Sequence, residues 1–90
     1  MTIQELKSAS ETLREASEGV SDEEVKAGIA EQADQMASLA EADRGPDHGR
    51  LARHEIKLSN LADAADQATA DAINAALEDI RAYRSTIEGV

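Results

Sequence analysis

RGPDHGRLARH, residues 44–54, separates two acidic, alanine-rich halves of this chain. The stretch contains the only proline, Pro46, together with both histidines and three of the nine Lys and Arg residues. Because proline lacks a backbone donor and restricts the residue before it, Gly45-Pro46 predicts the end of a helix. Asp47 is a favourable N-cap for the next one. The stretch is therefore predicted to be a tight connection between two helices.

Apolar residues on both sides of this connection recur at alternating spacings of three and four, which predicts amphipathic helices. We expect four of them, spanning about residues 3–18, 22–42, 47–64 and 68–88. Short connections favour antiparallel packing of successive helices. The predicted fold is all-α, an antiparallel up-down-up-down four-helix bundle that forms a single domain over residues 1–90.

Start and stop signals define the first two predicted helices. Thr2 and Ser21 each precede a glutamate at the capping-box position, so both are expected to be N-caps. Gly19 occupies a position where helices often end in a left-handed residue. Gly28 lies in the middle of the second helix, where it costs about 1 kcal/mol relative to alanine. A close helix crossing would account for it.

The connection between the third and fourth helices, near residues 64–68, contains neither glycine nor proline. Asp66 and Thr69 are alternative caps for the fourth helix. Without a break there, residues 47–88 would form one helix about 60 Å long, which would require an oligomer. Ile56 lies off the apolar stripe of the third helix, so we expect it to face a neighbouring helix or a second subunit.

The composition restricts the environment and the partners. The net charge of −10 disfavours nucleic acid, whose phosphates would be repelled. No cysteine, signal peptide or bilayer-spanning segment is evident, so a cytoplasmic protein without membrane contact is expected. Arg outnumbers Lys six to three and alanine replaces bulky hydrophobic residues, which indicates adaptation to high salt. At molar salt the Debye length falls to about 3 Å, which screens the self-repulsion.

The candidate site is the basic cluster of the connection, formed by Arg44, His48, Gly49, Arg50, Arg53 and His54. In one interpretation these side chains pair with carboxylates at the same end of the bundle, those of Glu5, Glu88 and the C-terminus. In a second, backbone N–H groups at the start of the third helix and the Arg side chains hold an anion or phosphate. His54 lies on the stripe of Leu51 and Leu58, which also explains it as a packed, hydrogen-bonded histidine.

No metal-binding or catalytic motif is evident. The remaining alternative for a metal is a site to which Asp47 and His48 contribute together with other segments of the chain. His48 and His54 are six residues apart, about 240° around a helix, so they do not share a face. The sequence contains no zinc or di-iron helix motif, no phosphate-binding glycine loop and no nucleophile elbow. No cofactor is expected.

The central run ADRGPDHGRLARHE, residues 42–55, and the ending IRAYRSTIEGV, residues 80–90, resemble a family of short, acidic haloarchaeal proteins of unknown function. The likeness covers most of the chain. It implies a haloarchaeal cytoplasm, in agreement with the charge, and it supplies no activity and no catalytic residues.

The expected function is non-enzymatic. Tyr83 is the only aromatic residue, and a thin, alanine-rich core gains from a partner chain. These features favour a protein–protein interaction module or a self-associating homodimer. The alternative is a small-ligand or anion-binding protein that uses the connection between the second and third helices.

Overall fold

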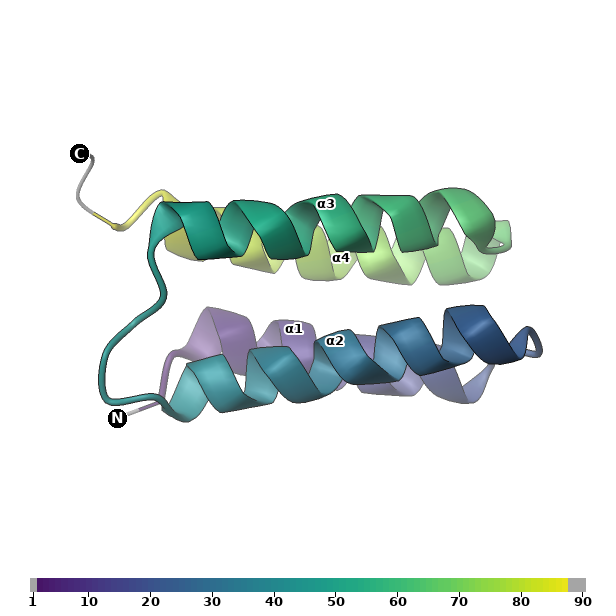
Figure 1. Cartoon of the computed structure of the whole chain (residues 1–90), viewed down its shortest axis with the longest axis horizontal. Helices are drawn as coiled ribbons and strands as arrows, with labels where there is room; N and C mark the ends of the chain where they lie inside the picture. Colours follow the sequence, from purple (N-terminus) through teal and green to yellow (C-terminus); the bar gives the residue numbers. More distant parts are fainter. Residues whose placement is uncertain (1, 88–90) are drawn as a thin grey trace.

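The computed structural model describes residues 2–87 and contains four helices (Figure 1). They are α1 (Gln4–Glu18), α2 (Glu23–Glu41), α3 (His48–Ala64) and α4 (Gln67–Arg84). No strand occurs within residues 2–87, which confirms the all-α class. None of the four helices in this described part has both the length and the apolar character that a bilayer crossing requires.

The first three helices agree with their predicted bounds to within one residue, whereas α4 ends at Arg84 instead of near residue 88. The hydroxyls of Ser85 and Thr86 donate to the carbonyls of Ala82 and Tyr83, at 2.7 and 2.6 Å. These local bonds compete with continuation of the helix, which explains the early end. Residue 88, which the prediction placed in the helix, lies outside the described residues.

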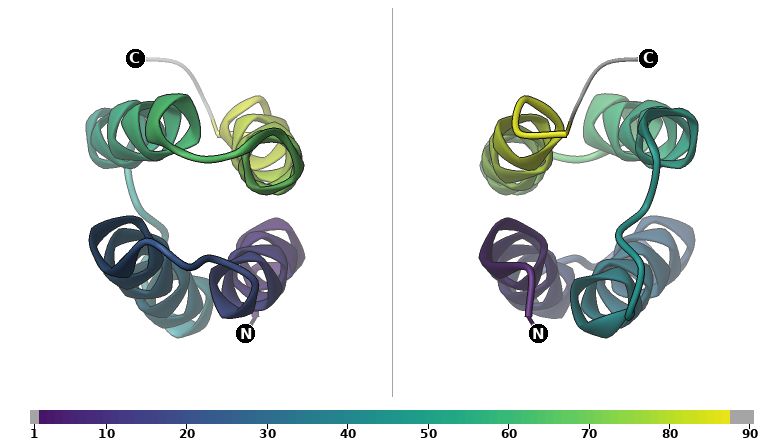
Figure 2. Two further views of the ribbon diagram at one scale, coloured as in Figure 1. Left: turned by 90° about the vertical axis from the view of Figure 1, so that its right-hand side faces the viewer. Right: turned by 90° about the vertical axis from the view of Figure 1, so that its left-hand side faces the viewer.

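The helices lie side by side along the longest dimension of a molecule that measures 38 × 22 × 16 Å. Seen end-on, they occupy four corners (Figure 2). Helix α1 contacts α2 and α4, α3 contacts the same two helices, and α1 and α3 lie diagonally opposite. The α2–α3 connection is at the same end as the start of α1 and the end of α4 (Figure 1). All four helices therefore share one core.

The core is aliphatic and is packed partly by small side chains. Its largest fully buried members are Leu6, Leu13, Ile29, Met36, Leu51, Leu58, Ile73, Leu77 and Ile80. Between α1 and α2 the buried residues include Ala9, Ser10 and Ala33. The Ser10 hydroxyl donates to the Ala33 carbonyl at 2.8 Å, which brings the two backbones close together. A core poor in bulky residues is thus filled by close approach of the helices.

Aspartates cap α3 and α4. Asp47 caps α3 as predicted, and of the two alternatives for α4 the cap is Asp66. Asp47 accepts from the Arg50 N–H and Asp66 from the Thr69 N–H, both at 2.8 Å. Hydrogen bonds from the backbone and the side chain of Thr69 lower the pKa of the Asp66 carboxyl. The break between α3 and α4 is therefore real, and the 60 Å single helix does not form.

The predicted caps of α1 and α2 were wrong. Asp22, one residue after Ser21, accepts two backbone N–H bonds of the first turn of α2, at 3.0 and 3.1 Å. Asp and Ser are comparable N-caps, and here the helix begins where the carboxylate reaches those amides. Ile3 occupies the cap position of α1 without a side-chain hydrogen bond. The Thr2 hydroxyl instead donates to Glu41 at 2.9 Å, which joins the start of α1 to the end of α2.

The structure accounts for one of the two glycines singled out. A Cβ added at Gly28 would lie 2.7 Å from Leu61 Cδ2, so the Leu61 side chain of α3 occupies the space beside Gly28 on α2. Gly19 does not adopt the left-handed conformation, because its φ is −92°. Helix α1 ends instead through a bond from the Gly19 N–H to the Ala16 carbonyl, at 3.2 Å.

Candidate functional site

The connection between α2 and α3 is held against α4. Pro46 is buried, and a Cβ added at Gly45 would lie 2.5 Å from the Tyr83 hydroxyl oxygen. A larger residue at Gly45 would require the end of the Tyr83 side chain to move, so glycine permits this close approach. The Asp47 carboxylate then caps the first turn of α3 and fixes where that helix begins.

The faces of α3 separate the predicted site residues into groups. Arg50, Arg53 and His54 line a groove between α3 and α2. His48 lies on the other side, where its Nδ1 accepts from Arg84 Nε of α4 at 3.3 Å. Arg44 and Gly49 are exposed and line no part of this groove. The structure thus brings together three of the six predicted site residues.

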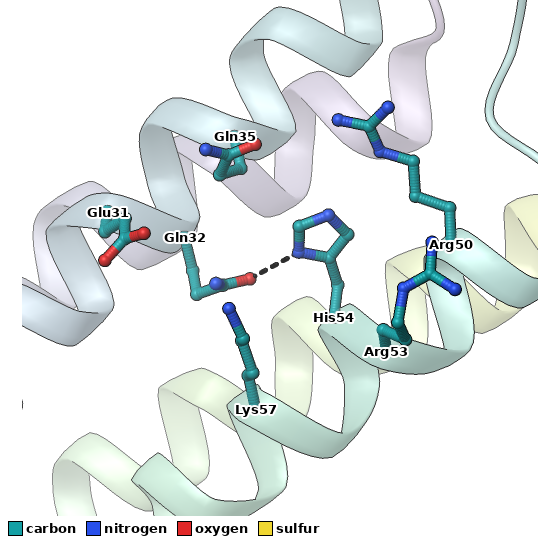
Figure 3. A pocket seen from close by; sticks show the side chains of 7 residues that line it. All are labelled: Glu31, Gln32, Gln35, Arg50, Arg53, His54 and Lys57. Atoms are coloured by element: carbon teal, nitrogen blue, oxygen red, sulfur yellow. Dashed lines mark hydrogen bonds between the residues drawn. The ribbon is translucent and has the colours of Figure 1, made fainter.

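The groove between α2 and α3 has a volume of about 290 Å³ (Figure 3). We call it the cationic groove, and its lining residues are Glu31, Gln32, Gln35, Arg50, Arg53, His54 and Lys57. The α3 residues are three or four positions apart and therefore share a face. The α2 residues form the opposite wall (Figure 3).

His54 lies at the centre of the cationic groove, hydrogen-bonded to a buried amide. Its Nδ1 donates to Oε1 of Gln32, 3 % exposed, at 2.8 Å. The amide oxygen only accepts, so Nδ1 carries the proton and Nε2 of the neutral ring is an acceptor. Partial burial, followed by the charges of Arg50, Lys57 and Arg53, lowers the pKa of His54 below its ordinary 6.5. The ring is therefore neutral at pH 7.

The cations of the groove have no carboxylate partner within the described part of the chain. Among residues 2–87, Arg50, Arg53 and Lys57 form no salt bridge, although Glu31 lies on the opposite wall. Arg44 forms none there either. The predicted pairing with acids at the end of the bundle therefore fails for the described carboxylates.

The arrangement of the helices explains why that pairing fails. Glu5 belongs to α1, which lies diagonally opposite α3 and does not contact it. Residue 88 and the C-terminal carboxylate, the other predicted partners, lie outside the described residues. The charges of the groove are thus free to interact with groups outside the described part of the molecule.

The side of α3 that faces α4 is neutralised by an acid that the sequence did not single out. Glu55, with a side chain only 13 % exposed, accepts from Arg81 Nε at 3.2 Å and from Arg84 Nη1 at 2.5 Å. Arg84 also reaches His48. This network joins α3 to the last turn of α4 and has a structural role.

Four lining residues of the cationic groove were not predicted, and two of them carried a signal. Gln32 is a polar residue on the otherwise apolar stripe of α2, which marks it as the partner of a polar group on a neighbouring helix. Lys57 follows Arg53 by four residues and Arg50 by seven, so periodicity places it on their face. Glu31 and Gln35 carried no such signal, because the opposite wall depends on how α2 and α3 pack.

The two histidines lie on different sides of α3, as their spacing predicts. In the part of the chain that the structure describes, no group of three or more His, Asp or Glu side chains is placed to hold a metal ion. The lining of the cationic groove contains guanidinium, ammonium, amide, imidazole and carboxylate groups. These groups bind by charge and hydrogen bonding, and the lining includes no hydroxyl or thiol nucleophile.

Comparison with curated proteins and with solved structures gave no match. The model of a family of unknown function, DUF7553, matches residues 1–86. This match includes all four helices and every lining residue of the cationic groove. Because it spans almost the whole chain, the chain belongs to the DUF7553 family of unknown function.

Proposed function

We propose that this chain is a non-enzymatic binding module whose cationic groove receives an acidic segment of a partner protein. The scaffold we propose is an antiparallel up-down-up-down bundle, with α2 and α3 as the walls of the site. The observation that carries the proposal is the gathering of Arg50, Arg53 and Lys57 around one groove. These cations form no salt bridge within residues 2–87, in a chain of net charge −10.

Carboxylates suit the groove better than a nucleic acid does. A polyanion such as DNA would extend beyond the groove over a chain whose net charge is −10 and be repelled. A short acidic segment needs to contact only the groove. The planar guanidinium groups of Arg50 and Arg53 match the two oxygens of a carboxylate.

We further propose that the protein works in the cytoplasm of a halophilic archaeon. The net charge, the excess of Arg over Lys and the aliphatic, alanine-rich core support this environment. At molar salt the Debye length is about 3 Å, so only groups in contact attract one another. A groove that holds several cations within reach of one bound segment meets that requirement.

The test is a titration of the ¹⁵N-labelled chain with a short glutamate peptide, followed by amide shifts in NMR spectra. We expect saturable shifts at Arg50, Arg53, His54 and Lys57. A glutamine peptide of equal length serves as the uncharged control, and inorganic phosphate tests for a small anion. If the groove amides do not respond to the glutamate peptide, the proposal is wrong. If phosphate alone shifts them, the groove is a small-anion site.

A pair of matched variants identifies the cations that bind. Arg53→Gln and Lys57→Gln each remove one charge from the groove, and both should weaken peptide binding about two- to fivefold, as loss of one exposed ion pair does. Lys7→Gln removes one charge from the exposed surface of α1, on the helix diagonally opposite α3. It should leave binding unchanged. Equal losses in all three variants would mean that only net charge matters.

A second candidate function, self-association, rests on Ile56. Its side chain is 61 % exposed, the only large hydrophobic side chain in the described residues with that degree of exposure. It lies in a shallow depression between α3 and α4, away from the cationic groove. If copies associate there, Ile56→Asn should convert dimers to monomers in sedimentation experiments. A strict monomer for the unchanged chain in high salt would remove this candidate.

A further inference from the structure

The cationic groove continues beyond Lys57 into a second hollow on the same surface. This hollow, of about 340 Å³, is lined by Gly28, Asn60 and Leu61 and shares Glu31, Gln32 and Lys57 with the cationic groove. The two hollows therefore form one continuous surface between α2 and α3. One end of it is cationic, and the other contains Gly28 and Leu61.

The floor of the second hollow is apolar because it is formed by Gly28 and Leu61. Gly28 has no side chain, and the Leu61 side chain occupies the space where its Cβ would be. Leu61 is half-buried and packs on the core, so part of its surface remains open to the hollow. The methylene chain of Lys57 adds further apolar surface next to it.

We infer that this second hollow is an apolar subsite for an aliphatic side chain of the same acidic segment. The inference rests on the proposed function, because the cations beside the hollow select the segment by charge complementarity. The preferred ligand is then an extended segment in which leucine, isoleucine or valine lies two positions from an acidic residue. A segment of acidic residues alone fills only the cationic end.

The spacing along α3 sets the spacing in the ligand. Lys57 and Leu61 are one helical turn apart, about 6 Å along the axis. In an extended peptide, side chains two positions apart lie on one side and are separated by about 6.6 Å. A carboxylate held by Lys57 therefore places the side chain two positions further along over Leu61.

The apolar subsite also gives the groove an attraction that salt does not screen. Contacts between charges weaken as ionic strength rises. Burial of apolar surface does not, and salts that are excluded from protein surfaces strengthen it. In high salt the aliphatic residue should therefore contribute a larger share of the affinity than the acids do.

The experiment compares two short capped peptides on the unchanged full-length chain. In the first peptide, serine and glutamate alternate in the centre. One leucine lies at each end, two positions from the nearest glutamate. Either direction of binding then brings a leucine to Leu61. In the second peptide asparagine replaces both leucines. We expect the leucine peptide to bind about tenfold more tightly, from burial of roughly half a leucine side chain.

The outcomes separate this inference from the proposed function. Equal dissociation constants for the two peptides, with shifts confined to Arg50, Arg53 and His54, would overturn the apolar subsite and leave the acidic groove standing. Absence of binding by both peptides would overturn both proposals. Tighter binding of the leucine peptide, with shifts at Gly28 and Leu61, would support the subsite.

A surface variant checks the location without disturbing the fold. Asn60 is exposed and lines the second hollow, so Asn60→Leu should enlarge the apolar floor and increase the preference for the leucine peptide. Asn74→Leu makes the same change at an exposed position of α4 that lies outside both hollows. An increase with Asn74→Leu as large as that with Asn60→Leu would contradict the assigned place.

Discussion

Two sides of α3 carry charged residues, which are paired in salt bridges on one side and form none within the described residues on the other. Towards α4, Glu55 neutralises Arg81 and Arg84, and the network joins two helices. Towards α2, Arg50, Arg53 and Lys57 line a groove with no salt bridge among residues 2–87. His54 and Glu55 are consecutive, yet they belong to different sides. Consecutive residues on a helix are about 100° apart. This angle places the charges that pair with α4 and the charges that are open to a ligand on different sides of α3.

The largest effect on stability should come from removing the salt bridges between α3 and α4. Glu55→Gln keeps the shape of the side chain but removes the charged acceptor for Arg81 and Arg84. We expect a loss of about 1.5 kcal/mol in the free energy of unfolding, the value of a charged hydrogen bond. Glu31→Gln, in the cationic groove, is the matched control and should change stability by less than about 0.5 kcal/mol. Urea denaturation measures the free energy of unfolding of both variants. Equal losses would contradict the proposed difference between the two sides of α3.

Both sides of α3 depend on where the helix begins, which the Asp47 cap sets. Asp47→Ala removes the acceptor for the Arg50 N–H and should cost about 1 kcal/mol of unfolding free energy. Asp43 is an exposed acid of the same connection that caps no helix, so Asp43→Ala should have little effect. Thermal unfolding followed by circular dichroism measures both. A neutral Asp47→Ala would mean that packing alone sets the start of α3.

The groove side should respond to pH through His54. Its pKa in the folded chain lies below 6.5, so the unfolded chain binds more protons as the pH falls from neutral. The contribution of neutral His54 to stability is therefore full above pH 6.5 and is lost as the pH falls through the lowered pKa. His54→Gln should remove this part of the pH dependence of the melting temperature. Identical pH profiles for the variant and the unchanged chain would contradict the assignment.

Binding of the acidic peptide should raise the lowered pKa of His54. Carboxylates in the cationic groove offset the charges of Arg50, Arg53 and Lys57, so the pKa of His54 should rise when the acidic peptide is bound. The peptide should therefore bind more tightly as the pH falls from neutral. NMR titration of the His54 ring, with and without the peptide, measures this directly. A pKa that stays the same would mean that the peptide binds elsewhere.

The smallest effect on stability should come from the groove cations themselves. Arg50→Gln and Arg53→Gln break no salt bridge described within residues 2–87, so each should change the free energy of unfolding by less than about 0.5 kcal/mol. Denaturation in molar KCl avoids a contribution from relief of net charge. A loss as large as that of Glu55→Gln would show that these cations are structural.

The helices and two of their caps followed from local patterns, because periodicity and capping act within a few residues. Asp47 was predicted as the cap of α3, and Asp66 was one of two alternatives, with Thr69, for the cap of α4. Ser21 and Asp22 are adjacent and chemically similar as caps, and the prediction chose the wrong one. The end of α4 was missed because the hydroxyls of Ser85 and Thr86 bond to the preceding turn.

Three of the seven residues that line the cationic groove belong to α2, so their place in the site depends on how two helices pack. Arg50, Arg53 and His54 are local to the basic stretch, and the groove includes all three. The wall formed by Gln32 and Gln35 belongs to a helix that ends before the connection. Its position depends on how α2 packs against α3, where the Leu61 side chain lies against Gly28.

The contact between Gly45 and Tyr83 has a practical consequence. Tyr83 is the only tyrosine in a chain without tryptophan or phenylalanine, so all of its aromatic fluorescence comes from one ring. That ring reports on the place where the α2–α3 connection meets α4. Detachment of the connection from α4 should therefore change tyrosine emission before helix content falls. Tyr83 is therefore an intrinsic fluorescent probe of the contact between the α2–α3 connection and α4.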